Sequence, residues 1–298
     1  MVSSIINSND PATADVVFLS ANYDQTSSFR KGADKGPAAI IQNLNRQIEF
    51  FSRSTGLVPT EHSRIAHFDP GDLNHLAPEA MVETLKDHCR RLWKRGKNLL
   101  ILLGGEHSIT NGFLKLAGEM GIAKEITIFQ IDAHLDLRDT DADYSDEPYG
   151  KYAHSCVMRR AAEIGFPIVS VGIRAYSEEE MELARKAGVS IFELRSREMP
   201  DLKKVVQAVS TEQVYITLDV DGIDPSSMPA TGTPVQGGLE WYYTLDLLRE
   251  IFLKKEVVGC DIVEVAPRLD DSLTEYGAAQ LAYEMIAYRL LKEQQYGK

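Results

Sequence analysis

The chain has 298 residues, of which 44% are hydrophobic and 26% charged, as in an ordinary folded globular protein. Its formal net charge of −12 disfavours nucleic acid as a partner, because nucleic-acid binding requires a basic surface, and it favours a cationic ligand. Because the sequence lacks a basic-then-apolar leader, an apolar run of about 18 residues and closely spaced cysteines, we expect a cytoplasmic protein with no membrane span, disulfide framework or thiolate zinc site.

Short runs rich in valine, isoleucine and leucine alternate along the chain with amphipathic segments. This alternation is typical of repeated strand–helix–strand units, which form a parallel sheet with helices on both faces. Most of the runs are apolar throughout, as strands covered on both faces should be. No linker rich in proline, glycine or serine divides the chain, so we predict a single domain over residues 1–298. The predicted strands cover residues 16–20, 99–103, 126–131, 168–171, 189–192, 214–218 and 257–263.

Helices are predicted in the intervals between these strands. In the segment that begins at Pro78, four apolar residues recur at steps of four and three, which places them on one buried stripe: Met81, Leu85, Cys89 and Leu92. The whole pattern predicts a three-layer α/β/α fold with a mainly parallel sheet. Similar stripes follow Pro37, Ser108, Ser177, Trp241 and Glu275.

Candidate metal ligands follow three of the predicted strands. In an extended chain, side chains two residues apart share a face, so Asp132, His134 and Asp136 can point the same way. Two carboxylates follow the strand at 214–218, and a histidine follows the strand at 99–103. Because the carboxyl ends of parallel strands meet at one edge of a sheet, we expect all these side chains to converge. The candidate set comprises His107, Asp132, His134, Asp136, Asp219 and Asp221.

Four carboxylates and two imidazoles are too many ligands for one ion, and they suit a pair of ions with shared carboxylates. Oxygen and nitrogen donors without a thiolate favour Mn²⁺, although Fe²⁺, Co²⁺ and Zn²⁺ accept similar ligands. Two such ions can lower the pKa of a shared water from about 15.7 towards about 7, which makes hydroxide available near neutral pH. We therefore predict two Mn²⁺ per chain and a hydrolytic reaction.

Three segments resemble the signatures of the ureohydrolase family, which includes arginase and agmatinase. They are Gly-Gly-Glu-His-Ser at 104–108, Asp-Ala-His-Leu-Asp at 132–136, and Asp-Val-Asp-Gly-Ile-Asp-Pro at 219–225 with Thr-Gly-Thr-Pro at 231–234. The likeness extends to Asp-Ile-Val-Glu at 261–264 and covers nearly the whole chain. It implies an arginase-like fold and the hydrolysis of a guanidinium group to urea and an amine by a metal-bridging hydroxide. It also implies a homo-oligomer, either a trimer or a hexamer.

The resemblance further implies roles for individual residues. Glu264 would hold the guanidinium through paired N–H···O bonds; otherwise it is a solvated strand end. His154 would transfer protons, although a lone histidine before a helix is often a packing residue. Asp136 can also receive the proton of the hydroxide and pass it to the leaving nitrogen. The implied ion sites are His107, Asp132, Asp136 and Asp219 for one manganese and His134, Asp132, Asp219 and Asp221 for the other, with Asp132 and Asp219 bridging.

The segment 138–151 separates this chain from the arginine-hydrolysing members of the family, which carry there an Asn- and Ser-containing loop that holds the substrate's α-carboxylate. Here the segment has five acidic residues, no asparagine and one serine, so it would repel a carboxylate and attract an amine. Residues 149–160 and 171–174 also resemble agmatinase. We therefore predict cleavage of agmatine to putrescine and urea, with guanidinobutyrate, arginine or a formimino compound as alternatives. The candidate residues for the amine are Asp141, Asp143 and Asp146.

Two functions of other classes remain as alternatives. A non-catalytic metal-binding homologue would often have lost some of the six ligands, all of which are present. A deacetylase of related fold uses a single zinc ion and would not need both acidic pairs. Release of urea separates both alternatives from the predicted reaction.

Overall fold

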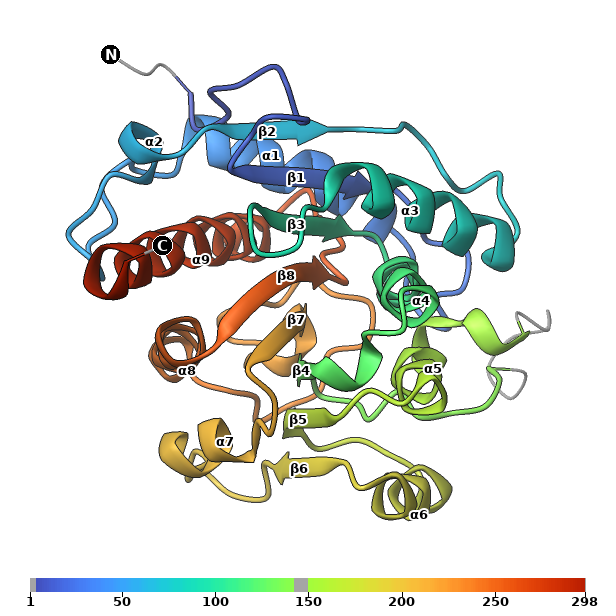
Figure 1. The fold of residues 1–298 in the computed structure, drawn as a ribbon. Coiled ribbons are helices and arrows are strands. Elements are labelled where there is room, and N and C mark those ends of the chain that lie inside the picture. Colours follow the sequence, from blue (N-terminus) through green and yellow to red (C-terminus); the bar gives the residue numbers. More distant parts are fainter. Residues whose placement is uncertain (1–3, 142–149, 298) are drawn as a thin grey trace.

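The computed structural model describes residues 4–141 and 150–297 (Figure 1). Within these residues, eight parallel strands form one sheet in the order β2-β1-β3-β8-β7-β4-β5-β6. The four central strands are buried along most of their length, which explains their apolar sequences. The strands are β1 (Val16–Ala21), β2 (Ile65–Phe68), β3 (Leu99–Gly104), β4 (Ile126–Ile131), β5 (Ile168–Ile173), β6 (Ser190–Glu193), β7 (Gln213–Asp219) and β8 (Glu256–Val263).

Helices cover both faces of the sheet and give the predicted three-layer α/β/α arrangement (Figure 1). Helices α3, α4, α5 and α6 lie on one face, and α1, α7, α8 and α9 lie on the other. Each face has its own hydrophobic core. The helices are α1 (Gly36–Arg46), α2 (Pro59–His62), α3 (Pro78–Leu92), α4 (Asn111–Glu119), α5 (Val157–Ile164), α6 (Glu178–Ala187), α7 (Leu202–Ala208), α8 (Trp241–Lys254) and α9 (Leu273–Tyr296).

Most predicted elements are confirmed. All seven predicted strands form, with ends that differ by one or two residues, and α3 buries the predicted stripe. The sequence prediction missed β2, a strand at the edge of the sheet that pairs with β1 and makes an isolated bridge to Ser8. It has only four residues, and one of them, His67, is polar and interrupts the apolar run expected of a covered strand. In the described part of the chain, no helix is both long and apolar enough to cross a membrane.

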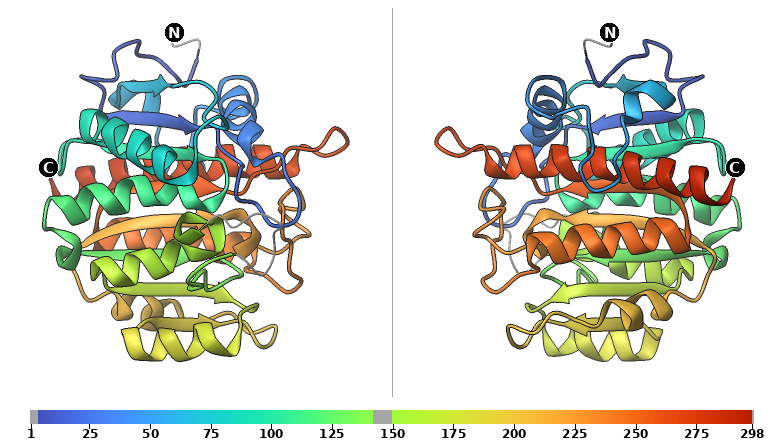
Figure 2. Two further views of the ribbon diagram at one scale, coloured as in Figure 1. Left: turned by 90° about the vertical axis from the view of Figure 1, so that its right-hand side faces the viewer. Right: turned by 90° about the vertical axis from the view of Figure 1, so that its left-hand side faces the viewer.

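The order of the strands sets the position of the candidate site. Strands β3, β8, β7 and β4 are neighbours, so the segments that follow their carboxyl ends lie side by side. Figure 2 shows the loops after β1, β7 and β8 gathered at this end of the sheet. The backbone at Gly105 packs tightly against the chain at the end of β1. An added Cβ at Gly105 would lie 2.5 Å from the carbonyl oxygens of Ala21 and Tyr23. A glycine is therefore needed for the segment that leads to His107.

Candidate active site

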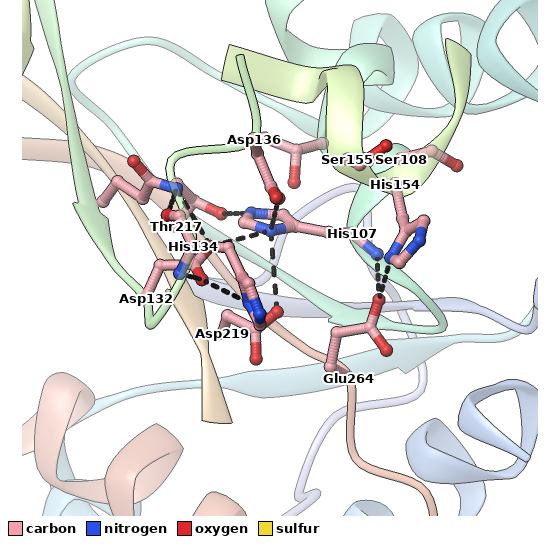
Figure 3. A network of polar contacts seen from close by, with 12 residues as sticks. His107, Ser108, Asp132, His134, Asp136, His154, Ser155, Thr217, Asp219 and Glu264 are labelled. Atoms are coloured by element: carbon pink, nitrogen blue, oxygen red, sulfur yellow. Dashed lines mark hydrogen bonds and ion pairs between the residues drawn. The ribbon is translucent and has the colours of Figure 1, made fainter. Parts of the chain in front are cut away.

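The imidazole of His107 lies among carboxylates at the carboxyl end of β3 (Figure 3). Its Nδ1 atom is 2.9 Å from Asp136 Oδ2, 3.2 Å from Asp132 Oδ2 and 3.6 Å from Asp219 Oδ2. Among the residues that the structure describes, none forms a hydrogen bond of suitable geometry with this buried atom. A nitrogen lone pair surrounded by carboxylate oxygens is an arrangement that a metal cation would satisfy.

The other ring nitrogen of His107 is fixed by a buried relay. Nε2 lies 2.7 Å from Thr217 Oγ1, and the Thr217 hydroxyl donates to Asp261 Oδ1 at 2.6 Å. Asp261 also accepts hydrogen bonds from the hydroxyls of Thr110 and Tyr215. Because the one hydrogen of the Thr217 hydroxyl is given to Asp261, its oxygen must accept from Nε2–H of His107. The relay therefore sets the tautomer that leaves Nδ1 free to bind a metal.

A second group of ligands lies next to the first and shares Asp132 with it. His134 Nδ1 is 3.1 Å from Asp221 Oδ2 and 3.6 Å from Asp132 Oδ1. In each group, His107–Asp132–Asp219 and Asp132–His134–Asp221, the potential ligand atoms lie within 4.8 Å of one another. Together with Asp136, the structure brings all six predicted ligands to one place.

The electrostatics of the cluster also fit bound cations. Burial and the charges of Asp221 and Asp132 raise the pKa of Asp219 well above 3.8. Burial and the charge of Asp132 raise the pKa of Asp136 to about 6. For Asp132, burial raises the pKa, but the neighbouring imidazoles of His107 and His134 outweigh this effect and lower it. Four carboxylates buried together repel one another, and the four positive charges of two divalent ions would balance them.

Backbone geometry, rather than a continuous strand, aligns the ligands after β4. The strand ends at Ile131, and Asp136 has the unusual φ of 53° for a residue other than glycine. Its carbonyl oxygen accepts hydrogen bonds from the N–H groups of Met158 and Arg159 at the start of α5. Asp221 Oδ1 accepts from the N–H of Ala133 at 3.1 Å. The period-two prediction thus found the right side chains, although the chain leaves the strand before it reaches them.

Glu264 and His154 lie beside the ligand cluster (Figure 3). Glu264 follows β8 with a φ of 64°, and its Oε1 accepts the backbone N–H of His107 at 2.9 Å. The same oxygen lies 3.6 Å from His154 Nδ1. Burial alone would lower the pKa of His154, but the hydrogen bond and charge of Glu264, with the charges of Glu106 and Asp136, raise it to about 9. His154 is therefore an imidazolium at neutral pH.

A cavity of about 530 Å³ opens from the cluster to the surface. Asp136, His154 and Asp219 line its inner part, and Phe29, which is 71% exposed, lines its mouth together with Tyr176. Its size and apolar mouth suit a small organic substrate with a charged head.

Of the three residues predicted to bind the substrate's amine, only Asp141 lies in the described part of the chain. Asp141 is buried, and its Oδ2 lies 3.7 Å from Nε2 of His154, the predicted proton-transfer residue. Asp143 and Asp146 lie outside the described residues. The sequence analysis overlooked Thr217 and Asp261, although both are polar residues inside apolar strands, and that signal could have identified them.

Comparison with known proteins agrees with this geometry. The model of the arginase family matches residues 14–287. An N(1)-aminopropylagmatine ureohydrolase of Synechocystis sp. is 36% identical over 285 residues, covering 93% of this chain and 90% of the relative. An agmatinase of Pyrococcus horikoshii is 33% identical over 286 residues, with 93% of each chain covered. The solved agmatine ureohydrolase of Thermoplasma volcanium has a TM-score of 0.84 at 30% identity, over 99% of this chain and 97% of that chain.

The fold, the site and these similarities define a hydrolase that acts on the carbon–nitrogen bonds of amidino groups. The chain belongs to the arginase family, and within it the chain is most like agmatinase. The resemblance found in the sequence signatures is thereby confirmed.

Proposed function

We propose that this chain is a manganese-dependent enzyme that cleaves agmatine to putrescine and urea at a pair of metal ions. The observation that carries the proposal is the pair of ligand groups that share Asp132 and lie beside Glu264 and His154. A single-metal hydrolase would need only one of these groups, so a pair of ions accounts for the donor set better.

The donors suit hard or borderline divalent ions. Carboxylate oxygens and imidazole nitrogens without a thiolate favour Mn²⁺, with Fe²⁺, Co²⁺ or Zn²⁺ able to substitute. When bound, the two ions supply hydroxide near neutral pH by lowering the pKa of water. One ion would be held by His107, Asp132, Asp136 and Asp219, and the other by His134, Asp132, Asp219 and Asp221.

Glu264 is the group that would hold the guanidinium. A guanidinium presents two parallel N–H groups, which match the two oxygens of one carboxylate. The backbone N–H of His107 fixes the orientation of this carboxylate through Oε1. The substrate carbon would then lie next to the metal ligands.

Proton transfer is assigned to His154 and Asp136. The amine that leaves the guanidinium carbon must gain a proton as the carbon–nitrogen bond breaks. His154 is charged at neutral pH and can give that proton, since its Nδ1 faces Glu264. Asp136, which lines the same cavity, can accept a proton from the attacking water and pass it to the leaving nitrogen.

The far end of the substrate is assigned to the cavity and the acidic segment beside it. Asp141 lines this cavity and would repel the α-carboxylate of arginine. Agmatine lacks this carboxylate. N(1)-aminopropylagmatine is a second candidate, because four similar relatives bear that substrate in their names and the cavity mouth is open at Phe29.

Steady-state release of urea from manganese-loaded protein tests the proposal. The substrates are agmatine, N(1)-aminopropylagmatine, arginine and guanidinobutyrate at equal ionic strength. An unpaired buried carboxylate costs about 3 kcal/mol, so we expect kcat/KM for arginine to be about 10²-fold below that for agmatine. Comparable values for the two would overturn the substrate, and no urea from any of the four would overturn the reaction.

The surroundings of the enzyme in the cell are part of the same proposal. We assign it to the cytoplasm, in keeping with three buried free thiols at Cys89, Cys156 and Cys260. We also assign it a trimeric or hexameric assembly, for which the exposed side chains of Tyr242 and Leu269 offer apolar contact surface. Light scattering coupled to size-exclusion chromatography measures the assembly, and a monomer at micromolar concentration would contradict it.

A further inference from the structure

Hydrogen bonds join the two ends of the loop between β1 and α1, and this loop places two hydroxyl groups next to His154. The buried carboxylate of Asp24 accepts hydrogen bonds from the hydroxyl of Ser27 and from the N–H groups of Gly32 and Ala33. The ammonium group of Lys31 donates to the carbonyl oxygens of residues 24 and 25, at 2.8 and 2.9 Å. These bonds join the two ends of the loop, so the side chains between them have defined positions.

Thr26 is the first of the two hydroxyl residues and is completely buried. Its Oγ1 accepts the backbone N–H of His154 at 3.0 Å and donates to Glu106 Oε1 at 2.7 Å. Glu106 is itself held by the N–H and hydroxyl of Ser108, at 2.7 and 2.8 Å. One hydroxyl thus joins the loop, the segment that carries His154 and the segment that carries the metal-ligand candidate His107.

Ser28 is the second hydroxyl residue and contacts the ring rather than the backbone. Its Oγ lies 3.0 Å from His154 Nε2, whereas Nδ1 of the same ring faces Glu264 at 3.6 Å. The carboxylate of Asp141, at 3.7 Å from Nε2, is farther away. Without the Ser28 hydroxyl, the charged ring would be drawn towards Asp141 and away from Glu264.

We propose that Thr26 and Ser28 are positioning residues for His154, Thr26 through its backbone and Ser28 through its ring. The inference rests on the proposed proton-transfer role of His154. Neither hydroxyl needs to touch the substrate, because each acts on the orientation of the imidazolium. Their loss should therefore lower kcat and leave KM nearly unchanged.

A double-mutant cycle tests Ser28. Ser28→Ala should lower kcat about tenfold, as expected for a lost hydrogen bond to a charged group, and change KM by less than about twofold. In a His154→Asn background the same change should have almost no effect, because the group that it positions is gone. Equal losses of kcat in both backgrounds would show that Ser28 acts elsewhere and would overturn the proposal for it.

A conservative pair of variants tests Thr26. Thr26→Val removes only the hydroxyl and should lower kcat by about tenfold or more, whereas Thr26→Ser should stay within about threefold of the wild type. Thr84→Val is the matched control, because the Thr84 hydroxyl donates to Ala80 O within α3. Equal losses in the valine and serine variants would overturn the role of the hydroxyl. If Thr26→Val does not fold, the kcat of Thr26→Ser still tests the role of the hydroxyl at position 26, and the double-mutant cycle still tests Ser28.

The same kinetic measurements distinguish failure of the proposed function from failure of the positioning roles. All kinetics use the guanidino compound that the wild type hydrolyses fastest, whichever of the four that is. If the wild type with metal releases urea from none of them, the proposed function fails and the positioning roles fail with it. If the wild type is active, the positioning roles are tested by two results. The coupling between Ser28 and His154 tests Ser28, and the activity retained by Thr26→Ser tests Thr26.

Discussion

His107 and His154 are both buried beside carboxylates, yet their surroundings fit them for different chemistry. In His107, Nε2–H is committed to the Thr217–Asp261 relay, and Nδ1 faces three carboxylates. In His154, both nitrogens face acceptors, Glu264 on one side and Ser28 on the other. One ring is arranged to offer a lone pair to a cation, and the other is arranged to carry a proton.

The difference shows that burial and a raised pKa do not by themselves assign a role to a histidine. The pKa of His107 is also raised well above 6.5, because the carboxylates of Asp132 and Asp136 outweigh burial. In that region a divalent ion can take the place of the proton, since several carboxylates converge on one nitrogen. Around His154 the acceptors are spread over both sides of the ring, with Glu264 facing Nδ1 and Ser28 facing Nε2, so the described carboxylates do not converge on one nitrogen.

Removal of the metal should have the largest effect. Dialysis against a chelator should abolish urea release, and added Mn²⁺ should restore it, because the region around His107 has no other source of hydroxide at neutral pH. Elemental analysis should find two ions per active chain. Fully active protein with one ion or fewer would contradict the two-ion interpretation of the six ligands.

His154→Asn tests the contrast between the two histidines directly. It should lower kcat about 10²-fold, the usual contribution of a positioned acid, while both ions stay bound. The measurement combines steady-state kinetics with metal analysis of the same preparation. Loss of an ion would show that His154 is a metal ligand, and an unchanged kcat would show that it serves only in packing.

The raised pKa of His154 predicts a pH-dependent stability in the metal-free protein. A histidine with a pKa of about 9 when folded and about 6.5 when unfolded adds stability that is complete below pH 6.5 and is lost as the pH rises through 9. The difference in unfolding free energy between wild type and His154→Asn should therefore fall by about 2 kcal/mol from pH 6.5 to 9. Denaturant titrations measure it, and a constant or rising difference would contradict the predicted charge state.

Thr217→Val should give the smallest effect and tests the relay behind His107. Without the hydroxyl, Nε2–H loses its acceptor and the ligand tautomer is no longer favoured, so affinity for one ion should fall about tenfold. Thr217→Ser should restore most of it. Competition with a fluorescent chelator measures the affinity, and equal affinities in the wild-type and valine proteins would remove Thr217 from the metal site.

The sequence by itself determined the architecture and the metal-ligand candidates. Covered parallel strands must be apolar, so their length is visible in a single sequence, and ligand candidates stand directly after β4, at Asp132, and at the last residue of β7, Asp219. The edge strand β2 was not predicted because it has only four residues, one of which is the polar His67. The acidic composition of residues 138–151 predicted the attraction of an amine, but not that Asp141 would lie beside His154.

Only the tertiary structure decided which polar groups support these residues. Thr217 reaches Asp261 because the register of β7 and β8 pairs them directly, although they are 44 positions apart in the sequence. Ser28 reaches His154 over 126 positions because the loop after β1 and the start of α5 meet at the same edge of the sheet. Hydrophobic periodicity records which face of an element is buried. The distance between two side chains on different elements depends instead on strand order and register, which no local pattern contains.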